Sequence, residues 1–163
     1  MGSSNYIRRL SGVFKPRHMR FLANLWPPFL AAGIRIDDIA NDYSFIRVSM
    51  GLKWYNRNYV GTHFGGSLYA MTDPFYMLML IQLLGRDFIV WDKAAAIDFV
   101  KPGMGRVTAE FRLSEELVSS VRQRALKEPK LLFDLPVEIK NEKNEVVAKV
   151  QKTLYVRFKG HSK

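Results

Sequence analysis

A single carboxylate stands inside the longest apolar run of this chain. Residues 67–84 are almost all apolar, yet Asp73 lies among them. Moving a carboxylate out of water costs several kcal/mol unless it is paired, hydrogen-bonded or protonated. Proteins keep such groups where local partners satisfy them, or where their ionisation is used in chemistry. Asp73 is therefore the first candidate for a group that takes up a proton or attacks a carbon atom.

A glycine pair precedes the same run and suggests a second kind of chemistry. Gly65 and Gly66 come directly before it. Because they lack side chains, a carbonyl oxygen can approach their backbone closely. At the start of a helix their free N–H groups point outward and carry the positive end of the helix dipole, which suits a developing oxyanion. The alternative is that both glycines serve only close packing at a helix start.

The residue after the acid offers a structural explanation for it. Pro74 has no N–H group, so it leaves the carbonyl of Ala70 without its helical donor and predicts a kink. An aspartate at such a kink can satisfy neighbouring backbone groups or face solvent. The residues alone do not decide whether Asp73 has this structural role or a role in chemistry.

The inventory of other reactive side chains is short. The chain has no cysteine, which excludes disulfides, thiolate metal sites and a cysteine nucleophile. Its three histidines are far apart in sequence, and none has the spacing of a metal ligand pair. They are His18, His63 and His161. We therefore expect no metal and no tightly bound cofactor.

Three segments are expected to be helical. Residues 16–32 read as helix with a break at Pro27-Pro28, and residues 66–84 read as one long apolar helix ending before Gly85. Residues 115–127 form a third, with Ser114 as its N-cap. The long helix is apolar on nearly all faces, so it must be covered on nearly all faces.

The remaining pattern predicts antiparallel strands. Alternating or extended apolar stretches are joined by turn sequences such as KPGMGR and NEKN. The expected strands are residues 44–53, 88–101, 106–114, 132–140 and 146–158. A curved antiparallel sheet wrapped around the long helix covers it on most sides, which is the hotdog arrangement of the α+β class.

The positive charge is concentrated at the beginning of the chain. The formal net charge is +10, and residues 1–36 hold six lysines and arginines and no acid. We expect a basic helical extension over residues 1–36 and a single domain over residues 37–163. A nucleic acid, an anionic membrane surface or a phosphorylated ligand would each suit this charge. No segment is long and apolar enough for a comfortable membrane span, and we expect a cytoplasmic protein.

Residues 58–73, NYVGTHFGGSLYAMTD, resemble the active-site segment of hotdog-fold acyl-CoA thioesterases, in particular the phenylacetyl-CoA-thioesterase-like group. That group carries Asn, a Gly, then His-Gly-Gly, then an acid seven residues after the second Gly. The matching residues here are Asn58, Gly61, Gly65, Gly66 and Asp73. The likeness extends over about residues 44–158, and the chain looks closest to an uncharacterised, domain-of-unknown-function branch. It departs from the group at Phe64, where relatives have His, while His63 lies one residue earlier.

The resemblance implies a reaction and a role for each residue. It implies hydrolysis of an acyl-CoA thioester, with Asp73 as general base or nucleophile acting across the interface of a homodimer or a dimer of dimers. The N–H groups of Gly65 and Gly66 would bind the oxyanion, and Asn58 would orient the water or the substrate carbonyl. Coenzyme A enters only as part of the substrate. His63 is a further catalytic candidate, because a shift of one residue on a loop can still point its imidazole at the site, although the shift favours a structural role.

Phe64 is also a candidate for substrate contact, and the further candidates are charged. The resemblance places Asp92 and Lys93 near the partner's site, although an ordinary ion pair at a strand end explains them as well. Four cations are candidates for the phosphates of coenzyme A, although such a group is usually a solvated surface. They are Arg106, Arg122, Arg124 and Lys127.

Two functions of other classes remain open. One is a non-catalytic hotdog protein that binds acyl-CoA or lipid, which Phe64 in the place of His favours. The other is a protein that binds nucleic acid or a membrane surface through residues 1–36. The second ranks lower for nucleic acid, because the chain lacks the stacking aromatic and basic pattern of RNA-binding modules.

Overall fold

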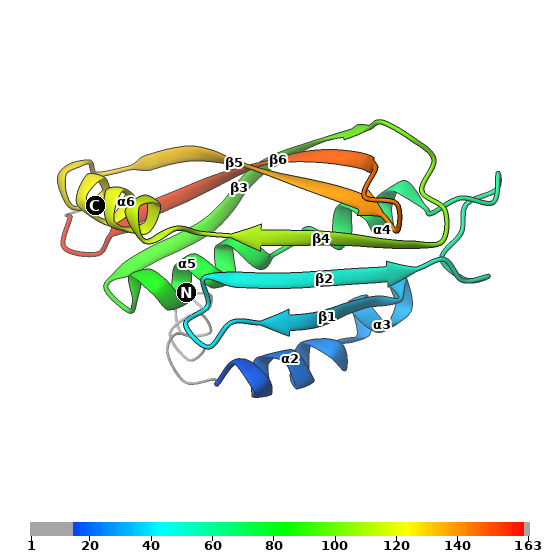
Figure 1. The fold of residues 1–163 in the computed structure, drawn as a ribbon. Coiled ribbons are helices and arrows are strands. Elements are labelled where there is room, and N and C mark those ends of the chain that lie inside the picture. Colours follow the sequence, from blue (N-terminus) through cyan, green and yellow to red (C-terminus); the bar gives the residue numbers. More distant parts are fainter. Residues whose placement is uncertain (1–14, 162–163) are drawn as a thin grey trace, which may run out of the picture.

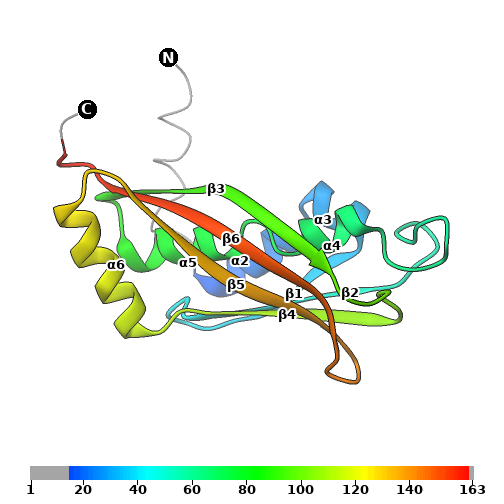
Figure 2. The same ribbon diagram turned by 90° about the horizontal axis from the view of Figure 1, so that it is seen from above.

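The computed structural model describes residues 15–161, which fold into five helices and one sheet. The helices are α2 (Pro16–Asn24), α3 (Pro27–Ala32), α4 (Gly65–Ala70), α5 (Phe75–Leu84) and α6 (Glu115–Lys127). The sheet curves around α4 and α5, α2 and α3 lie along its first strand, and α6 lies at one end (Figures 1 and 2). The expected α+β hotdog architecture is confirmed.

The sheet has six strands and is antiparallel throughout. The strands are β1 (Ile34–Ile39), β2 (Phe45–Gly51), β3 (Phe88–Phe99), β4 (Arg106–Arg112), β5 (Leu131–Asn141) and β6 (Val146–Phe158). Their order across the sheet is β1-β2-β4-β5-β6-β3. Both β1 and β3 are therefore edge strands, and the two edges differ in how they are covered.

Strand β1 was not expected from the sequence, and the boundary expected after residue 36 falls within it. The strand pairs with β2, and α2 covers its outer edge. The side chain of Asn24 accepts from the N–H of Ile36 at 2.7 Å and donates to the carbonyl of Ile36 at 3.0 Å. The guanidinium of Arg20 donates to the carbonyl of Asp37 at 2.9 Å. These bonds occupy edge groups that would otherwise be open to another strand.

The long helix expected over residues 66–84 is two helices. The α4 helix ends at Ala70 and α5 begins at Phe75, and the Asp73-Pro74 peptide bond between them is cis. Proline cannot donate to the preceding turn, so the helix cannot continue through it. The hydroxyl of Thr72 donates to the carbonyl of Tyr69 at 2.8 Å and closes the last turn of α4. The kink that the sequence predicted is thus a complete break, and Asp73 lies at it.

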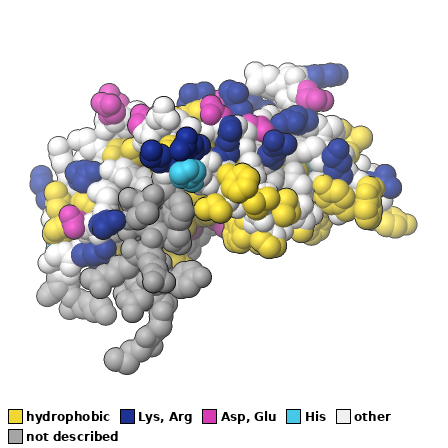
Figure 3. All heavy atoms as spheres, turned by 90° about the horizontal axis from the view of Figure 1, so that it is seen from below, with side chains coloured by type: hydrophobic (Ala, Val, Ile, Leu, Met, Phe, Trp, Pro, Cys, Tyr) yellow, Lys and Arg dark blue, Asp and Glu magenta, His cyan; other side chains and the backbone are white. Residues whose placement is uncertain are grey.

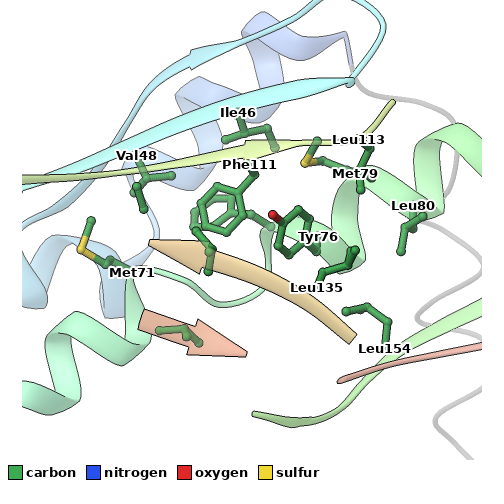
Figure 4. Close-up of a cluster of buried hydrophobic side chains, with 14 of the residues drawn as sticks. Ile46, Val48, Met71, Tyr76, Met79, Leu80, Phe111, Leu113, Leu135 and Leu154 are labelled. Carbon is green, nitrogen blue, oxygen red and sulfur yellow. The ribbon is translucent and has the colours of Figure 1, made fainter. Parts of the chain in front are cut away.

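Large apolar side chains of α5 fill the space under the sheet (Figure 4). The ring of Phe75 lies 5.0 Å from that of Phe111 on β4, and Tyr76 meets the same ring edge-on at 5.1 Å. The hydroxyl of Tyr76 donates to the carbonyl of Pro136 at 2.8 Å, and burial raises the pKa of Tyr76 to about 12. This packing fixes α5, and with it the break that carries Asp73.

Candidate active site

A buried lysine joins two aspartates at the break between α4 and α5. The ammonium of Lys152 lies 2.8 Å from Oδ1 of Asp73 and 3.3 Å from Oδ2 of Asp92. The Lys152 side chain is only 1% exposed, whereas that of Asp73 is 46% exposed. The cluster therefore has a buried cation at its base and one carboxylate that solvent or a substrate can reach.

Three separate elements bring these groups together. Lys152 lies on β6 between Val150 and Leu154, and all three are buried. Asp92 follows the buried Val90 on β3, at a point where the register against β6 shifts. Such a bulge re-aims a side chain, and bulges are frequent beside active sites.

The electrostatics of the cluster depend on this burial. Burial raises the pKa of Asp92 to about 6, against the attraction of Lys152, and the nearby carboxyl of Asp73 adds to the rise. Burial alone would lower the pKa of Lys152, but its ion pairs with Asp73 and Asp92 hold that pKa above its usual value. Lys152 therefore stays charged at neutral pH, with one close carboxylate and a second one that ionises less readily.

Asp92 is also incompletely paired. Its contact with Lys152 is an ion pair without hydrogen-bond geometry, and neither of its buried oxygens has a hydrogen-bond partner within residues 15–161. An unpaired buried acceptor is costly, and such groups often mark functional sites.

A cavity of about 340 Å³ opens over the cluster. Asp73, Asp92 and Lys152 form its polar wall. Its other lining residues include Tyr69, Met77, Trp91 and Lys93. The ammonium of Lys152 also lies 5.6 Å from the centre of the Tyr69 ring, which adds a cation–π contact. The cavity thus combines an exposed carboxylate with an apolar wall.

The predicted loop residues gather elsewhere, around a second cavity of about 420 Å³. Asn58, His63 and Gly65 line it, together with Phe99 and residues 100–103. Within one chain the structure therefore brings Asp73, Asp92 and Lys93 to one cavity, and Asn58, His63 and Gly65 to the other.

The amide of Asn58 is fully used inside its own loop. Its oxygen accepts from the N–H groups of Val60 and Thr62, at 3.1 and 3.0 Å. Its nitrogen donates to the hydroxyl of Thr62 at 2.9 Å and to the carbonyl of His63 at 3.4 Å. An asparagine side chain has two acceptor sites and two donor hydrogens, so no capacity remains to orient a water or a substrate. Within one chain these bonds give Asn58 a structural role in shaping the loop, and its expected role toward the substrate stays a prediction.

His63 ties the same loop to the turn before β4. Its side chain is buried, its Nε2 lies 2.9 Å from the carbonyl of Gly105, and its backbone N–H donates to Gly103. A carbonyl only accepts, so Nε2 carries the proton. Burial lowers the pKa of His63, against the opposite effect of the bond to Gly105. The geometry agrees with the structural interpretation of this histidine.

Aromatic rings lie against the glycine pair. A Cβ on Gly65 would meet the ring of Phe99 at 2.9 Å, and one on Gly66 would meet the ring of Phe64 at 2.5 Å. Both rings are more than half exposed, so a side chain at either glycine would displace the ring that lies against it. The first amides bonded within α4 are those of Ser67 and Leu68, which donate to the carbonyl of Phe64. The N–H groups of Gly65 and Gly66 precede them, at the first turn of the helix.

The arginines expected to meet coenzyme A have other partners. Arg106 pairs with Asp37 at 3.1 Å and donates to Ser49 at 2.6 Å. Arg124 pairs with Glu128 at 3.1 Å along α6. None of the three arginines expected at the phosphates lines either cavity described above.

Arg122 closes the end of α5. It donates to the carbonyls of Leu83 and Leu84, at 2.7 and 3.0 Å. A cation at a helix C-terminus also meets the negative end of the helix dipole. Each of the three arginines thus has a partner within the chain, and their contact with the phosphates of coenzyme A stays a prediction.

The sequence reading missed Lys152, although a signal for it was present. From Ala148 to Val156 every second residue of β6 is buried, and Lys152 occupies one of these inward positions, between the apolar Val150 and Leu154. A charge on the inward face of a strand requires a buried partner of opposite sign. Asp73 and Asp92 were already candidates for that partner.

The raised pKa of Asp92 predicts a particular dependence of stability on pH. An unfolded aspartate has a pKa near 4, so the folded state binds this proton more tightly. Its contribution to stability is complete below about pH 4 and is lost as the pH rises through about 6. We expect Asp92→Asn to remove that loss, so that the stability of the variant relative to the parent rises between these pH values. Chemical denaturation across this range measures the difference. A difference that does not change with pH would contradict the environment described for Asp92.

Several solved structures share the fold of this chain over most of its length. A protein of unknown function from Pseudomonas aeruginosa, described as a probable thioesterase, has a TM-score of 0.78 at 20% identity, over 89% of this chain and 97% of the other. A thioesterase from Haemophilus influenzae has a TM-score of 0.64 at 17% identity, over 93% and 96% of the two chains. The PaaI protein of the E. coli phenylacetic acid degradation operon has a TM-score of 0.58 at 20% identity, over 86% and 89%. At these identities the likeness shows the fold, which is that of the hotdog proteins.

The family follows from the sequence. The chain belongs to the family described as Domain of unknown function (DUF4442), whose model matches residues 16–156. No curated protein matches the sequence. None of the helices within residues 15–161 is long and apolar enough to cross a membrane.

Proposed function

We propose that this chain hydrolyses acyl-CoA thioesters and that Asp73 is the catalytic residue. The observation that carries the proposal is the exposed carboxylate of Asp73, held at 2.8 Å by a buried lysine at the wall of a cavity. A carboxylate held in place beside an apolar cavity suits the activation of water next to an acyl group. Similarity to proteins named as thioesterases supports the same reaction.

The proposed reaction assigns one step to each group. Asp73 takes a proton from water as the water oxygen attacks the thioester carbon. The developing oxyanion binds to the N–H groups of Gly65 and Gly66, and the C–S bond then breaks and releases the coenzyme A thiolate. Asp73 returns its proton to the thiolate or to solvent. While Asp73 holds the proton, Asp92 remains beside Lys152 and keeps that buried cation paired.

The proposed assembly is a dimer through the open edge of β3. This strand pairs with β6 on one side only, is twelve residues long and carries exposed Trp91 and Phe99. Long exposed edges are templates for pairing with a second chain. The opposite edge, β1, is covered by the side chains of Asn24 and Arg20. The residues at the middle of β3 are Ala94, Ala95 and Ala96, which leave room for a second strand.

Such a dimer would unite the two cavities. In an antiparallel pairing of β3 with itself centred on Ala95 and Ala96, residues 91–94 lie opposite residues 97–100 of the other chain. The first group lines the cavity of Asp73, and the second lies at the cavity of Gly65. The ring of Phe99 already touches the Gly65 position in its own chain. The proposed site therefore takes Asp73 from one chain and the Gly65 N–H from the other.

Mixed dimers test this arrangement. We expect homodimers of Asp73→Asn and of Gly65→Val to be inactive, the second because a side chain at Gly65 collides with Phe99. In a dimer that combines the two variants, one composite site keeps both Asp73 and Gly65. Co-expression should therefore restore about a quarter of parental activity, since half of the dimers are mixed and each has one intact site. No recovery in purified mixed dimers would show that each site is built from a single chain.

The proposed activity itself is tested by turnover. Purified protein is offered acyl-CoA thioesters of increasing chain length, and release of free coenzyme A thiol is measured. We expect hydrolysis that depends on chain length, because Met77 and Trp91 give the cavity an apolar wall.

A second candidate function, binding without hydrolysis, is favoured by Phe64 in the place of the usual histidine. Retention of an acyl-CoA in native mass spectrometry, with no thiol release from any member of the series, would establish that candidate instead.

A further inference from the structure

The two helices before β1 expose a continuous apolar face that the proposed reaction does not use. Figure 3 shows hydrophobic side chains grouped on the underside of the molecule, where α2 and α3 lie, with lysine and arginine side chains beside them. We call this surface the α2–α3 face. Its exposed apolar side chains are Phe21, Leu22, Leu25, Trp26 and Leu30. Patches of this kind on soluble proteins mark interaction sites.

The inward contacts of α2 do not account for these side chains. No residue of α2 is buried, and the helix meets the rest of the protein mainly through Met19, Ala23 and the hydrogen bonds of Asn24. Phe21 is 65% exposed and Leu25 is 53% exposed. Helix α2 is therefore amphipathic, with an apolar side that the rest of the fold leaves in solvent.

The charge around the face has one sign along this part of the chain. Lys15, Arg17 and Arg20 are exposed on or beside α2, and the first acid of the sequence, Asp37, is paired with Arg106. A groove of about 750 Å³ runs between α2 and β1 beside the face. Its lining combines Arg17, Arg20 and Arg35 with the apolar side chains of Phe21 and Leu25, and it also holds the ion pair of Asp37 with Arg106. Guanidinium groups bind phosphate, and apolar side chains bind acyl chains.

We propose that the α2–α3 face docks on the surface of an anionic phospholipid bilayer, with its apolar side chains at the acyl boundary and its arginines at the phosphates. Amphipathic helices of this composition, with Phe, Leu and Trp on one side and Lys and Arg on the other, lie in the plane of the membrane interface. The helices would lie flat on the lipid, and the β3 edge would stay free at the other side of the sheet. Docking of this kind needs no helix that crosses the membrane.

Vesicle binding by the full-length protein tests the proposal. The purified chain is sedimented with vesicles of phosphatidylcholine, and with vesicles of phosphatidylcholine mixed with phosphatidylglycerol. We expect binding to the mixed vesicles that weakens with added salt, and much weaker binding to pure phosphatidylcholine. In a Trp54→Phe/Trp91→Phe background, Trp26 is the only tryptophan and should be quenched by brominated lipid.

Paired variants separate the apolar and the charged contributions. Phe21→Ser/Leu25→Ser should lower partition into mixed vesicles by roughly tenfold or more. Lys15→Gln/Arg17→Gln should lower it by on the order of tenfold on mixed vesicles and little on pure phosphatidylcholine. The matched control is Leu126→Ser/Leu132→Ser, which removes two exposed leucines outside the face and should bind as the parent does. Equal thermal midpoints would show that all variants are folded.

Several outcomes would overturn the proposal. One is unchanged vesicle binding in Phe21→Ser/Leu25→Ser. Another is that the parent protein does not bind vesicles, while Phe21→Ser/Leu25→Ser has a different sedimentation coefficient from the parent. That result would make the face a contact between copies of the chain. Salt-dependent binding to RNA without vesicle binding would assign the face to nucleic acid. Vesicle binding that begins only after deletion of residues 1–14 would show that this segment covers the face in the full chain.

Discussion

The Asp73→Asn variant is expected to lose about 10²–10⁴-fold in kcat for acyl-CoA hydrolysis, the range of a general base. The substitution keeps the size of the side chain, and its amide oxygen can still accept from Lys152 at the 2.8 Å position of Oδ1. The amide cannot take a proton from water at neutral pH. The variant therefore separates the chemistry of the carboxylate from its place in the structure. Initial rates at saturating substrate measure the effect on catalysis. The free energy of unfolding, measured in parallel, gives the effect on stability.

The control for this variant is Asp38→Asn. Asp38 is an exposed aspartate of β1, at the opposite edge of the sheet from β3. We expect its replacement to leave both kcat and KM unchanged. If Asp73→Asn hydrolysed acyl-CoA at the parental rate, Asp73 would be only a structural partner of Lys152, and the proposed reaction would fail.

The sequence predicted those parts of the fold that depend on local pattern. Alternation at period two predicted β2, β4 and β5, and the turn sequence NEKN predicted that β6 follows β5. Ser114 marked the start of α6, where its hydroxyl accepts from Leu117 at 3.2 Å. Strand β1 was not predicted because its register against β2 shifts between Ile36 and Asp38, and this bulge interrupts the alternation of apolar and polar residues. Pattern reading depends on an unbroken period, so a bulge in a strand of only six residues hides it.

The candidate site was predictable only in part, for a different reason. An acid in an apolar run made Asp73 conspicuous, and Lys152 could have been found from its inward phase on β6. Their partnership joins residues 79 positions apart, so it depends on how the sheet folds over the helices. The hydrogen-bond partners of Asn58 could not be predicted from its residue type. A loop amide can bond to the loop backbone or to a ligand, and which of these it does depends on the backbone groups around it.

The Lys152→Met variant is expected to destabilise the protein by about 2–5 kcal/mol, because it leaves carboxylates without their buried cation. Methionine has a similar length and fits the apolar neighbours of β6, so a cavity contributes little to the loss. The half-exposed carboxylate of Asp73 can turn to solvent, but that of Asp92 is held in the interior. Denaturation in urea at neutral pH measures the loss. Lys149→Met, at an exposed position of the same strand, is the matched control and should be near neutral.

The reason for this loss can be tested independently of its size. If the loss comes from the buried charge of Asp92, then Lys152→Met/Asp92→Asn should regain most of it, because no buried carboxylate remains without a cation. The loss in Lys152→Met should also shrink as the pH falls, since a protonated Asp92 needs no cation. A loss that is independent of pH, and is not relieved by Asp92→Asn, would mean that Lys152 acts through packing. In that case Asp73 would not depend on a buried charge for its position, and the electrostatic support for the proposed site would be withdrawn.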